Sequence, residues 1–585
     1  VCAHNDAVAT AHGHITRNNQ YIAATIQWLH GIAADLEGIS PRSIRCFAFG
    51  EFDFIPRITV GISVFIEETF RACLRKTDQR NKARFDVLRG EVAISTGATA
   101  DPAEAIAMLR RVRAAVGDKF ILIFRISAMD MLEGGLAWDE VVTLGKAVVE
   151  AGASIVSTHF CWHEAQVPTI ATMVPRAAFA GVTGKLREAV SIPLITSNRI
   201  NMPHVAEEVL ARGDADLISM ARPMLADPDL VKKAWEGRED EINTCIGCNQ
   251  ACLDHIFNGQ LTSCLVNPRA CHELELQVAP VTSVKKFAVV GAGPAGLAFA
   301  VTAAERGHHV TLFDAAAEIG GQFNLAKRIP GKEEFNETLR YFRVRLQQLG
   351  VALRLNQRVD VAALNGGDFD EIILATGIAP RTPEIPGIDE GIAQGRVLRY
   401  VDVVSGRAGV GKSVAIIGAG GIGFDVAEFL SHGATSASQN IEQFMREWGV
   451  DMSLQARGGI EGILAEIEPS PRRIYLLQRK QTKVGANLGK TTGWIHRLGL
   501  LKKNVQMISG CEYERIDANG LHVRINGEAK VLAVDNIVIC AGQEPLRELL
   551  EGLHKPFHMV GGADVAAELD AKRAIDQATR LALTI

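Results

Sequence analysis

The sequence lacks the features that mark membrane, secreted and nucleic-acid-binding proteins. No apolar run is long enough to cross a bilayer, and nothing at the start of the chain resembles a signal peptide. The formal net charge is only −5, which gives no sign of a nucleic-acid partner. We therefore expect a cytoplasmic protein that binds neither membrane nor nucleic acid, with no obligate protein partner evident.

Aromatic residues are also scarce, at 6% of the chain, and low-complexity tracts are missing. The apolar fraction of 47% and the charged fraction of 22% are nevertheless ordinary for a globular protein. A chain of 585 residues then predicts three or four domains. The 55 glycines are more informative, because many of them fall in patterns typical of phosphate-binding loops.

Four of the 11 cysteines follow a metal-binding spacing. Cys245, Cys248, Cys252 and Cys264 read C-x2-C-x3-C-x11-C, and three thiolates in one loop with a fourth downstream can close around a 4Fe–4S cluster. Structural zinc, which more often uses paired C-x2-C units, and no metal at all are the alternatives. A disulfide is disfavoured without a secretory signal, and we expect Cys271 to be a bystander.

The segment FAVVGAGPAGL begins a dinucleotide-binding unit. An apolar strand runs into Gly291, Gly293 and Gly296 at GxGxxG spacing, and a helical pattern follows. These glycines permit a tight turn, a close approach to a pyrophosphate and close packing of helix on strand. The next strand, at 309–313, ends at Asp314, where a carboxylate can hold the ribose hydroxyls.

The segment SVAIIGAGGIGF repeats this unit, with Gly418, Gly420 and Gly423. The following strand, RIYLL, ends in a glutamine and then Arg479 and Lys480 instead of an acid. Two cations at this place suit a 2′-phosphate, so the second site is predicted to take NADPH rather than NADH. Solvated charges at a strand end are the alternative. Two dinucleotide-binding units in one chain indicate one flavin, FAD, and one nicotinamide cofactor.

Several other segments are expected to lie against the FAD. DEIILATGIAPR is typical of the strand and turn where a chain crosses between two such domains. HMVGGADVA presents a glycine pair and an acid that could reach the ribityl or pyrophosphate region, with an ordinary turn acid as the alternative. The further predicted contacts are Ala295, Gly321, Gln322, Ala375, Thr376, Gly377 and Asp564.

Before the cysteines, four short apolar segments alternate with helical patterns: FILIFRIS, ASIVSTHF, IPLITSN and ADLISMAR. This is βα repetition at the spacing of a barrel, whose functional residues lie at the C-terminal strand ends. Arg125 is predicted at such an end, and Arg199, Ala221 and Arg222 are predicted to bind a mononucleotide phosphate. Structural salt bridges are the alternative for the arginines. His163, just past a strand end, is the predicted catalytic residue, with a structural histidine as the alternative.

Taken together, these motifs resemble the bacterial 2,4-dienoyl-CoA reductase family, which is similar to trimethylamine dehydrogenase in architecture and to old yellow enzyme in its barrel. The resemblance covers about residues 105–585 and is carried by NTCIGCNQACLD, SCLVNPRACHE, VVGAGPAGLAFA, EIGGQFN, AIIGAGGIGFD, LGKTTGWIHR and VICAGQEP. It implies an α/β fold with a (β/α)8 TIM barrel, incomplete at its N-terminal end, then an iron–sulfur segment and two Rossmann-like domains.

The implied domains are an FMN-binding barrel at 1–235, a 4Fe–4S segment at 236–285, an FAD domain at 286–390 and 541–585, and an NADPH domain at 391–540. The implied reaction is the NADPH-dependent reduction of 2,4-dienoyl-CoA to enoyl-CoA in the β-oxidation of unsaturated fatty acids. Electrons would pass from NADPH to FAD, to the cluster, to FMN and to the acyl-CoA substrate. His163 would bind the thioester carbonyl oxygen or help to deliver the proton.

Residues 1–100 depart from the family. TIQWLHG resembles its third barrel strand, in which Gln27 would face the FMN, but two preceding strands have no counterpart. The family's proton-donating tyrosine also has none, because only Tyr21 precedes residue 341. Two alternative functions therefore stay open: a reductase for another enoate or enone, or an NADPH-oxidising electron-transfer protein, a diaphorase, with a non-functional barrel.

Overall fold

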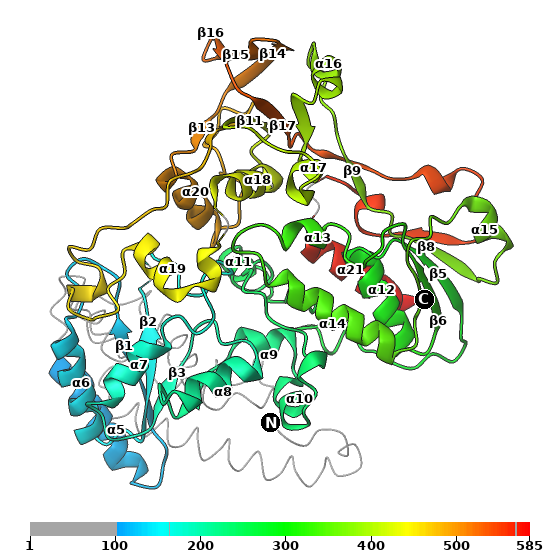
Figure 1. The fold of residues 1–585 in the computed structure, drawn as a ribbon. Coiled ribbons are helices and arrows are strands. Elements are labelled where there is room, and N and C mark those ends of the chain that lie inside the picture. The colour runs from blue at the N-terminus through cyan, green and yellow to red at the C-terminus, as the bar shows by residue number, and fades with distance from the viewer. Residues whose placement is uncertain (1–101, 163, 434, 568–569) are drawn as a thin grey trace. The chain divides into compact units, whose positions relative to one another are not determined.

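The structure is a computed structural model that describes residues 102–162, 164–433, 435–567 and 570–585 (Figure 1). The described residues divide into two compact units, 102–126 with 150–153 and 127–149 with 154–585. In the first unit, helix α5 (Pro102–Val116) is held by Arg113, whose Nε donates to the Gly152 carbonyl at 2.8 Å. The predictions for Gln27 and His163 lie outside the described residues.

Four strands form the described barrel sheet in the order β1 (Ile123–Met129), β2 (Ile155–Phe160), β3 (Leu194–Thr196) and β4 (Leu217–Ile218). The last three pair in parallel. Helices α6 (Trp138–Glu150), α7 (Ala180–Arg187) and α8 (Pro203–Ala211) alternate with the strands. Strand β1 runs to Met129, two residues past the predicted end, so Arg125 lies mid-strand with an exposed side chain and not at a strand end.

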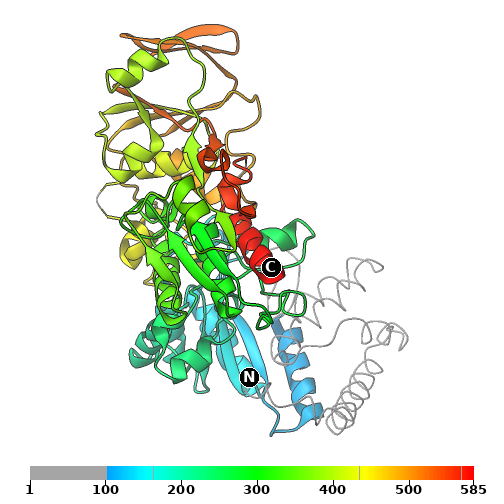
Figure 2. The same ribbon diagram turned by 90° about the vertical axis from the view of Figure 1, so that its right-hand side faces the viewer.

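The second sheet has the order β19-β8-β5-β6-β7. Its strands are β5 (Lys286–Val290), β6 (His309–Phe313), β7 (Ala352–Arg354), β8 (Glu371–Leu374) and β19 (Phe557–Met559), all in parallel. Helices α12 (Pro294–Glu305), α14 (Phe335–Gln348) and α21 (Ala571–Thr584) belong to the same domain as this sheet. The last strand and helix come from the end of the chain, and Figure 2 shows α21 in red beside the green elements.

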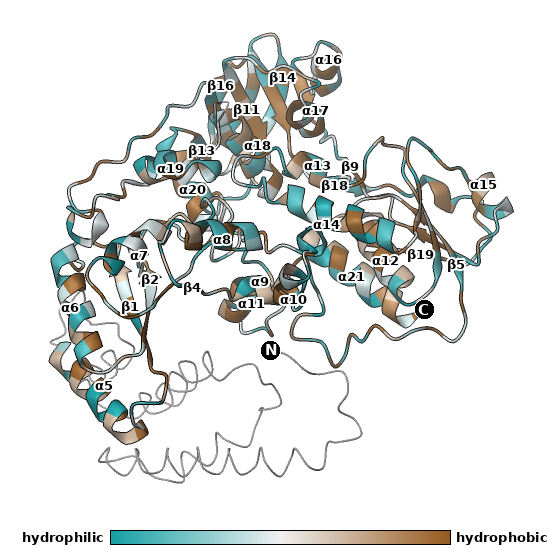
Figure 3. Ribbon diagram, turned by 60° about the horizontal axis from the view of Figure 1, so that its bottom comes forward, coloured by the Kyte–Doolittle hydropathy of each residue, from teal (hydrophilic) through white to brown (hydrophobic). Residues whose placement is uncertain are grey.

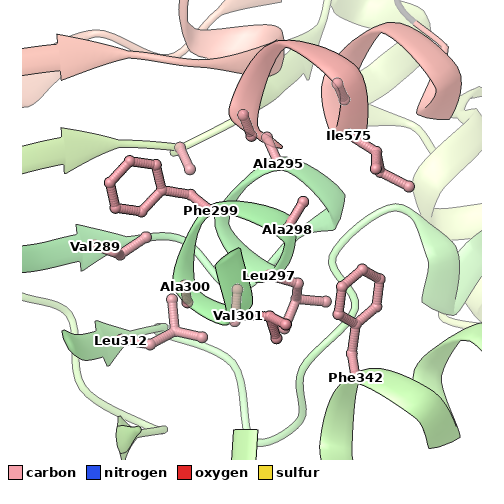
Figure 4. Packing of buried hydrophobic residues seen from close by; sticks show 14 of the residues in the cluster. Val289, Ala295, Leu297, Ala298, Phe299, Ala300, Val301, Leu312, Phe342 and Ile575 are labelled. Carbon is pink, nitrogen blue, oxygen red and sulfur yellow. The ribbon is translucent and has the colours of Figure 1, made fainter. Parts of the chain in front are cut away.

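Helix α12 is enclosed on all sides. Every residue from 295 to 303 is buried, because the helix contacts the sheet, α14 and α21 together. Alanines on α12 leave room for α21, while Leu297 and Phe299 fill the space toward Phe342 and the sheet (Figure 4). The apolar strands β5 and β1 are brown in the hydropathy view of Figure 3. This packing fixes the helix whose first turn meets the glycine loop.

A third parallel sheet, β10-β17-β11-β12-β13, carries the second glycine loop. Its strands are β10 (Val397–Arg399), β11 (Ser413–Ile417), β12 (Arg473–Leu477), β13 (Gln506–Ile508) and β17 (Asn536–Ile539), with α17 (Tyr400–Ser405), α18 (Gly421–Ser431) and α20 (Gly493–Lys502) beside it. An antiparallel sheet follows, with β14 (Cys511–Asp517), β15 (Gly520–Ile525) and β16 (Glu528–Leu532). Strands β9 (Ile378–Pro380) and β18 (Gln543–Pro545) pair where the chain crosses between the two dinucleotide folds.

The segment between α18 and β12 leaves its own domain and packs on the barrel. Its helix α19 (Ile441–Trp448) places Phe444 and Met445 in one apolar cluster with Met129 and Phe160, at the ends of β1 and β2. Two backbone hydrogen bonds stabilise this contact. Met131 N donates to Gly458 O at 2.8 Å, and Gly458 N donates to Leu136 O at 3.0 Å. The insertion therefore ties the third sheet to the barrel.

A buried ion network joins the barrel to the domain of the second sheet. Glu334, 8% exposed at the start of α14, accepts from Arg199 Nη2 at 2.6 Å and from Arg176 Nε at 2.9 Å. Asn201 donates to the same carboxylate at 3.3 Å and to the carbonyl of Cys245 at 2.8 Å. Burial opposes the charge, but the two arginines outweigh it and lower the pKa of Glu334 to about 2.

Replacing Glu334 with glutamine should lower the free energy of unfolding by about 3–5 kcal/mol, because it leaves the buried guanidinium of Arg199 without its counter-charge. Denaturant unfolding followed by intrinsic fluorescence measures this loss. Glu337→Gln is the matched control, since Glu337 pairs with Arg176 at 3.1 Å but is 22% exposed; its loss should be about 1 kcal/mol or less. Equal effects for the two variants would contradict the prediction.

Candidate functional site

The four predicted ligand cysteines meet at one pocket. Cys245, Cys248, Cys252 and Cys264 all line one small pocket. Cys252 is the N-cap of helix α11 (Leu253–Phe257), and the chain returns to bring in the fourth cysteine, with Ser263 N donating to Ala251 O at 2.7 Å. The spacing read from the sequence thus places the thiols around a common centre.

Burial changes the acidity of three of these thiols. Burial raises the pKa of Cys248 to about 12 and also raises those of Cys252 and Cys264, so the free thiols stay protonated until a metal displaces their protons. Among the described residues, no three His, Cys, Asp or Glu side chains are arranged to hold a single metal ion.

The arginines predicted to bind a phosphate are engaged by the chain itself. Arg199 pairs with Glu334 and also donates from Nε to the carbonyl of Val174 at 2.9 Å, as the salt-bridge alternative predicts. Arg222 donates to Asn249 Oδ1 at 2.5 Å and to Ile170 O at 2.8 Å, and it lines the cysteine pocket. Both guanidinium groups are therefore hydrogen-bonded to protein groups among the described residues, and their assignment to a phosphate stays a prediction. Ala221 is the N-cap of the short helix α9 (Arg222–Ala226).

A buried acid organises the loop that precedes His163. Asp130, 3% exposed after the end of β1, accepts hydrogen bonds from Leu136 N at 2.7 Å, from Trp162 Nε1 at 2.8 Å and from Ser127 Oγ. Sequence reasoning did not single out this residue. An acid directly after an apolar strand was the available signal. One of these three hydrogen bonds positions the indole of Trp162, the residue adjacent to the predicted catalytic histidine.

The first glycine loop has no room for side chains at two of its glycines. Gly291 has φ +109°, and a Cβ there would lie 2.3 Å from the carbonyl oxygen of Ala375. A Cβ on Gly296 would lie 1.9 Å from the oxygen of Gly291. A Cβ on Gly293 would meet no described atom within 4 Å, which leaves the open cradle that a pyrophosphate needs.

The other predicted flavin contacts gather around this loop. Asp314 accepts from the amide of Ala292 at 2.7 Å, within the loop. A Cβ on Gly321 would lie 3.0 Å from Gly293 Cα, which places Gln322 nearby. Asp564 is held by Gln577 at 2.7 Å, close to the start of α12, where Gly561 abuts Ala295. Of the crossover residues Ala375, Thr376 and Gly377, the first touches Gly291 directly.

The second glycine loop repeats the geometry of the first. Gly418 also has φ +109°, and its Cβ would lie 2.2 Å from Cys540 O, whereas Gly420 is open. A Cβ on Gly423 would lie 1.9 Å from Gly418 O. Arg479 and Lys480 follow β12, whose last carbonyl, at Leu477, accepts from Gly418 N at 3.0 Å. Both cations are exposed, and neither pairs with a carboxylate in the described part of the chain.

Two family models match these parts of the chain. Residues 104–241 match the NADH:flavin oxidoreductase / NADH oxidase family, and residues 285–571 match the pyridine nucleotide-disulphide oxidoreductases. Over these residues the chain is similar to the domains of flavin-dependent oxidoreductases. These domains support FMN, FAD and NAD(P)H as cofactors, and they confirm the α/β class with a barrel of the old yellow enzyme type and Rossmann-like domains.

Named relatives act on different acceptors. The chain is 34% identical to a metal reductase of Desulforamulus reducens over 76% of this chain and 65% of that protein. It is 34% identical to an NADH oxidase of Thermoanaerobacter brockii over 59% of this chain and 53% of that protein. The solved complex of 2-naphthoyl-CoA reductase with 2-naphthoyl-CoA matches with a TM-score of 0.73, at 26% identity over 84% of this chain and 69% of that one. The chain thus spans less than two thirds of the length of either curated relative.

None of the described helices is long and apolar enough to cross a bilayer.

Alanine at Gly293 and at Gly291 should have distinguishable effects. Gly293→Ala should remove bound FAD while leaving the melting temperature of the flavin-free protein unchanged, because its methyl group fills the cradle and touches no protein atom. Gly291→Ala should also lower that melting temperature, because φ is positive and the methyl group meets a carbonyl. Flavin absorbance after gel filtration and thermal unfolding measure the two effects. A flavin-loaded Gly293→Ala protein would contradict this placement of the cofactor.

Proposed function

We propose that the protein is an NADPH-dependent 2,4-dienoyl-CoA reductase that holds FMN, FAD and a 4Fe–4S cluster. The observation that carries the proposal is the combination of two glycine loops of the same geometry with a pocket lined by four thiols. A dinucleotide donor delivers electrons in pairs, and an iron–sulfur cluster carries one electron at a time. The combination is therefore suited to moving electrons between two flavins in separate domains.

The two glycine loops would divide the dinucleotides between them. At the first loop, Asp314 presents a carboxylate beside the glycines, which suits the ribose of FAD. At the second loop, Arg479 and Lys480 present two unpaired cations in the equivalent place, which suits the 2′-phosphate of NADPH. When bound, the flavins and the cluster would supply hydride and single-electron transfer.

The barrel would hold the acyl-CoA. Asp130 positions the indole of Trp162, and we assign to the adjacent His163 the hydrogen bond to the thioester carbonyl oxygen. A donor at this oxygen stabilises the negative charge that develops when a hydride is added to the conjugated chain. An acyl-CoA ligand in the similar 2-naphthoyl-CoA reductase supports a thioester substrate.

The second candidate function is an NADPH-oxidising electron-transfer protein whose barrel reduces no enoyl thioester. One observation favours it: Arg199 and Arg222, the predicted phosphate ligands of the barrel, are occupied by protein groups. The metal reductase and the NADH oxidase among the relatives also show that such chains pass electrons to other acceptors. FMN content separates the two functions, because the diaphorase needs only FAD and the cluster.

The deciding experiment is cofactor release from anaerobically purified protein, combined with NADPH oxidation in the presence and absence of 2,4-hexadienoyl-CoA. We expect FAD, FMN and about four irons per chain, with NADPH consumption that depends on the thioester and yields an enoyl-CoA by mass spectrometry. FAD and iron without FMN, together with oxidation of NADPH by artificial dyes alone, would overturn the reductase and leave the electron-transfer protein.

Replacing both Arg479 and Lys480 with alanine should raise the KM for NADPH by about tenfold to a hundredfold, the cost of losing charged hydrogen bonds to a phosphate. The KM for NADH should change little, because NADH has no 2′-phosphate. Steady-state kinetics with each nucleotide measure the two KM values. Lys483→Ala, an exposed lysine on the same loop, is the control. A parallel rise in both KM values would show that the cations do not read the 2′-phosphate.

A further inference from the structure

The segment LGKTTGWIHR has no role in the reaction described above, although it lies in the domain that carries the second glycine loop. It spans the end of the connection from β12 to α20 and the first half of α20. Arg479 and Lys480 lie near the start of this connection, and its end reaches α11, the helix that follows Cys252. Thr491 donates to Asp254 Oδ1 from its backbone N at 2.8 Å and from Oγ1 at 2.8 Å.

The contact is close enough to require a glycine. A Cβ on Gly489 would lie 2.5 Å from Asp254 Oδ2, although the backbone of Gly489 is not in the left-handed region. The adjacent Lys490 donates from Nζ to the carbonyl of Phe257 at 2.9 Å, at the C-terminal end of α11. Residues 489–491, which we call the clamp, therefore hold both ends of this short helix.

The acid at the centre of this contact is buried and close to the cysteine pocket. Asp254 is 7% exposed and lies two residues after Cys252, the N-cap of α11. On the far side of the helix, Lys572 of α21 lies 3.2 Å from His255 Nε2. Since a five-residue helix has little stability of its own, its position depends on these partners. A displacement of α11 would move the thiol of Cys252.

We propose that the clamp is a positioning element that holds α11, and with it Cys252, so that the cluster is retained. The inference rests on the proposed 4Fe–4S cluster, but it concerns residues of the nicotinamide-binding domain that no ligand motif includes. The connection from β12 to α20 would then have two roles. Its start would bind the 2′-phosphate, and its end would position α11.

The test is iron release to a chelator, followed by absorbance, from the anaerobically purified holoenzyme. Gly489→Ala and Thr491→Val should release iron about tenfold faster than the wild type, the factor expected from losing a hydrogen bond to a charged group. Thr491→Ser keeps the hydroxyl and the amide and should restore the slow rate. Gly499→Ala is the matched control, because its Cβ would lie 3.8 Å from the nearest atom, Glu428 Oε1, and so displaces nothing.

Two further readouts separate a clamp from general destabilisation. The melting temperature should stay unchanged. The rate of FAD reduction by NADPH should also stay unchanged, because this step comes before the cluster in the proposed order of electron transfer. The electron paramagnetic resonance signal of the reduced cluster should broaden. Iron release at the wild-type rate from both variants would overturn the clamp and leave the proposed function intact. Wild-type protein without iron would instead overturn the cluster itself, and both proposals with it.

Discussion

The buried carboxylate of Glu334 is the interaction on which the arrangement of the larger unit depends. It neutralises Arg199 from the barrel and accepts from Asn201, which also holds the backbone of Cys245. Three segments, the barrel, the cysteine loop and the flavin domain, therefore meet at one charge. A buried pair of this kind adds little net stability over an apolar contact, but it strongly penalises any arrangement that separates the partners.

The two dinucleotide-binding folds show how one backbone geometry serves two cofactors. Gly291 and Gly418 share the same φ, and each approaches a carbonyl so closely that no side chain fits. The difference lies one strand later, where the first fold presents Asp314 and the second presents Arg479 and Lys480. In the proposed function, the sign of this charge would distinguish two sites whose phosphate cradles are alike.

The domain with the second glycine loop contacts the rest of the chain partly through an insertion and a loop. The insertion with α19 packs on the ends of β1 and β2, and the clamp at residues 489–491 holds the helix next to Cys252. Each contact combines a close approach at a glycine, Gly458 or Gly489, with hydrogen bonds to a neighbouring loop. These contacts hold the barrel ends and the cysteine pocket against the domain expected to receive NADPH.

The sequence by itself determined the features whose physics is local: the α/β class, the two glycine loops and the cysteine spacing, because a turn or a set of thiols needs particular residues at fixed short separations. Tertiary structure decided the partners of isolated charges. Arg199 finds Glu334 135 residues away, and Asp254 finds Thr491 237 residues away. Arg222 finds Asn249 at the cysteine pocket. No periodicity encodes such pairings, since they depend on which surfaces meet after the domains have folded.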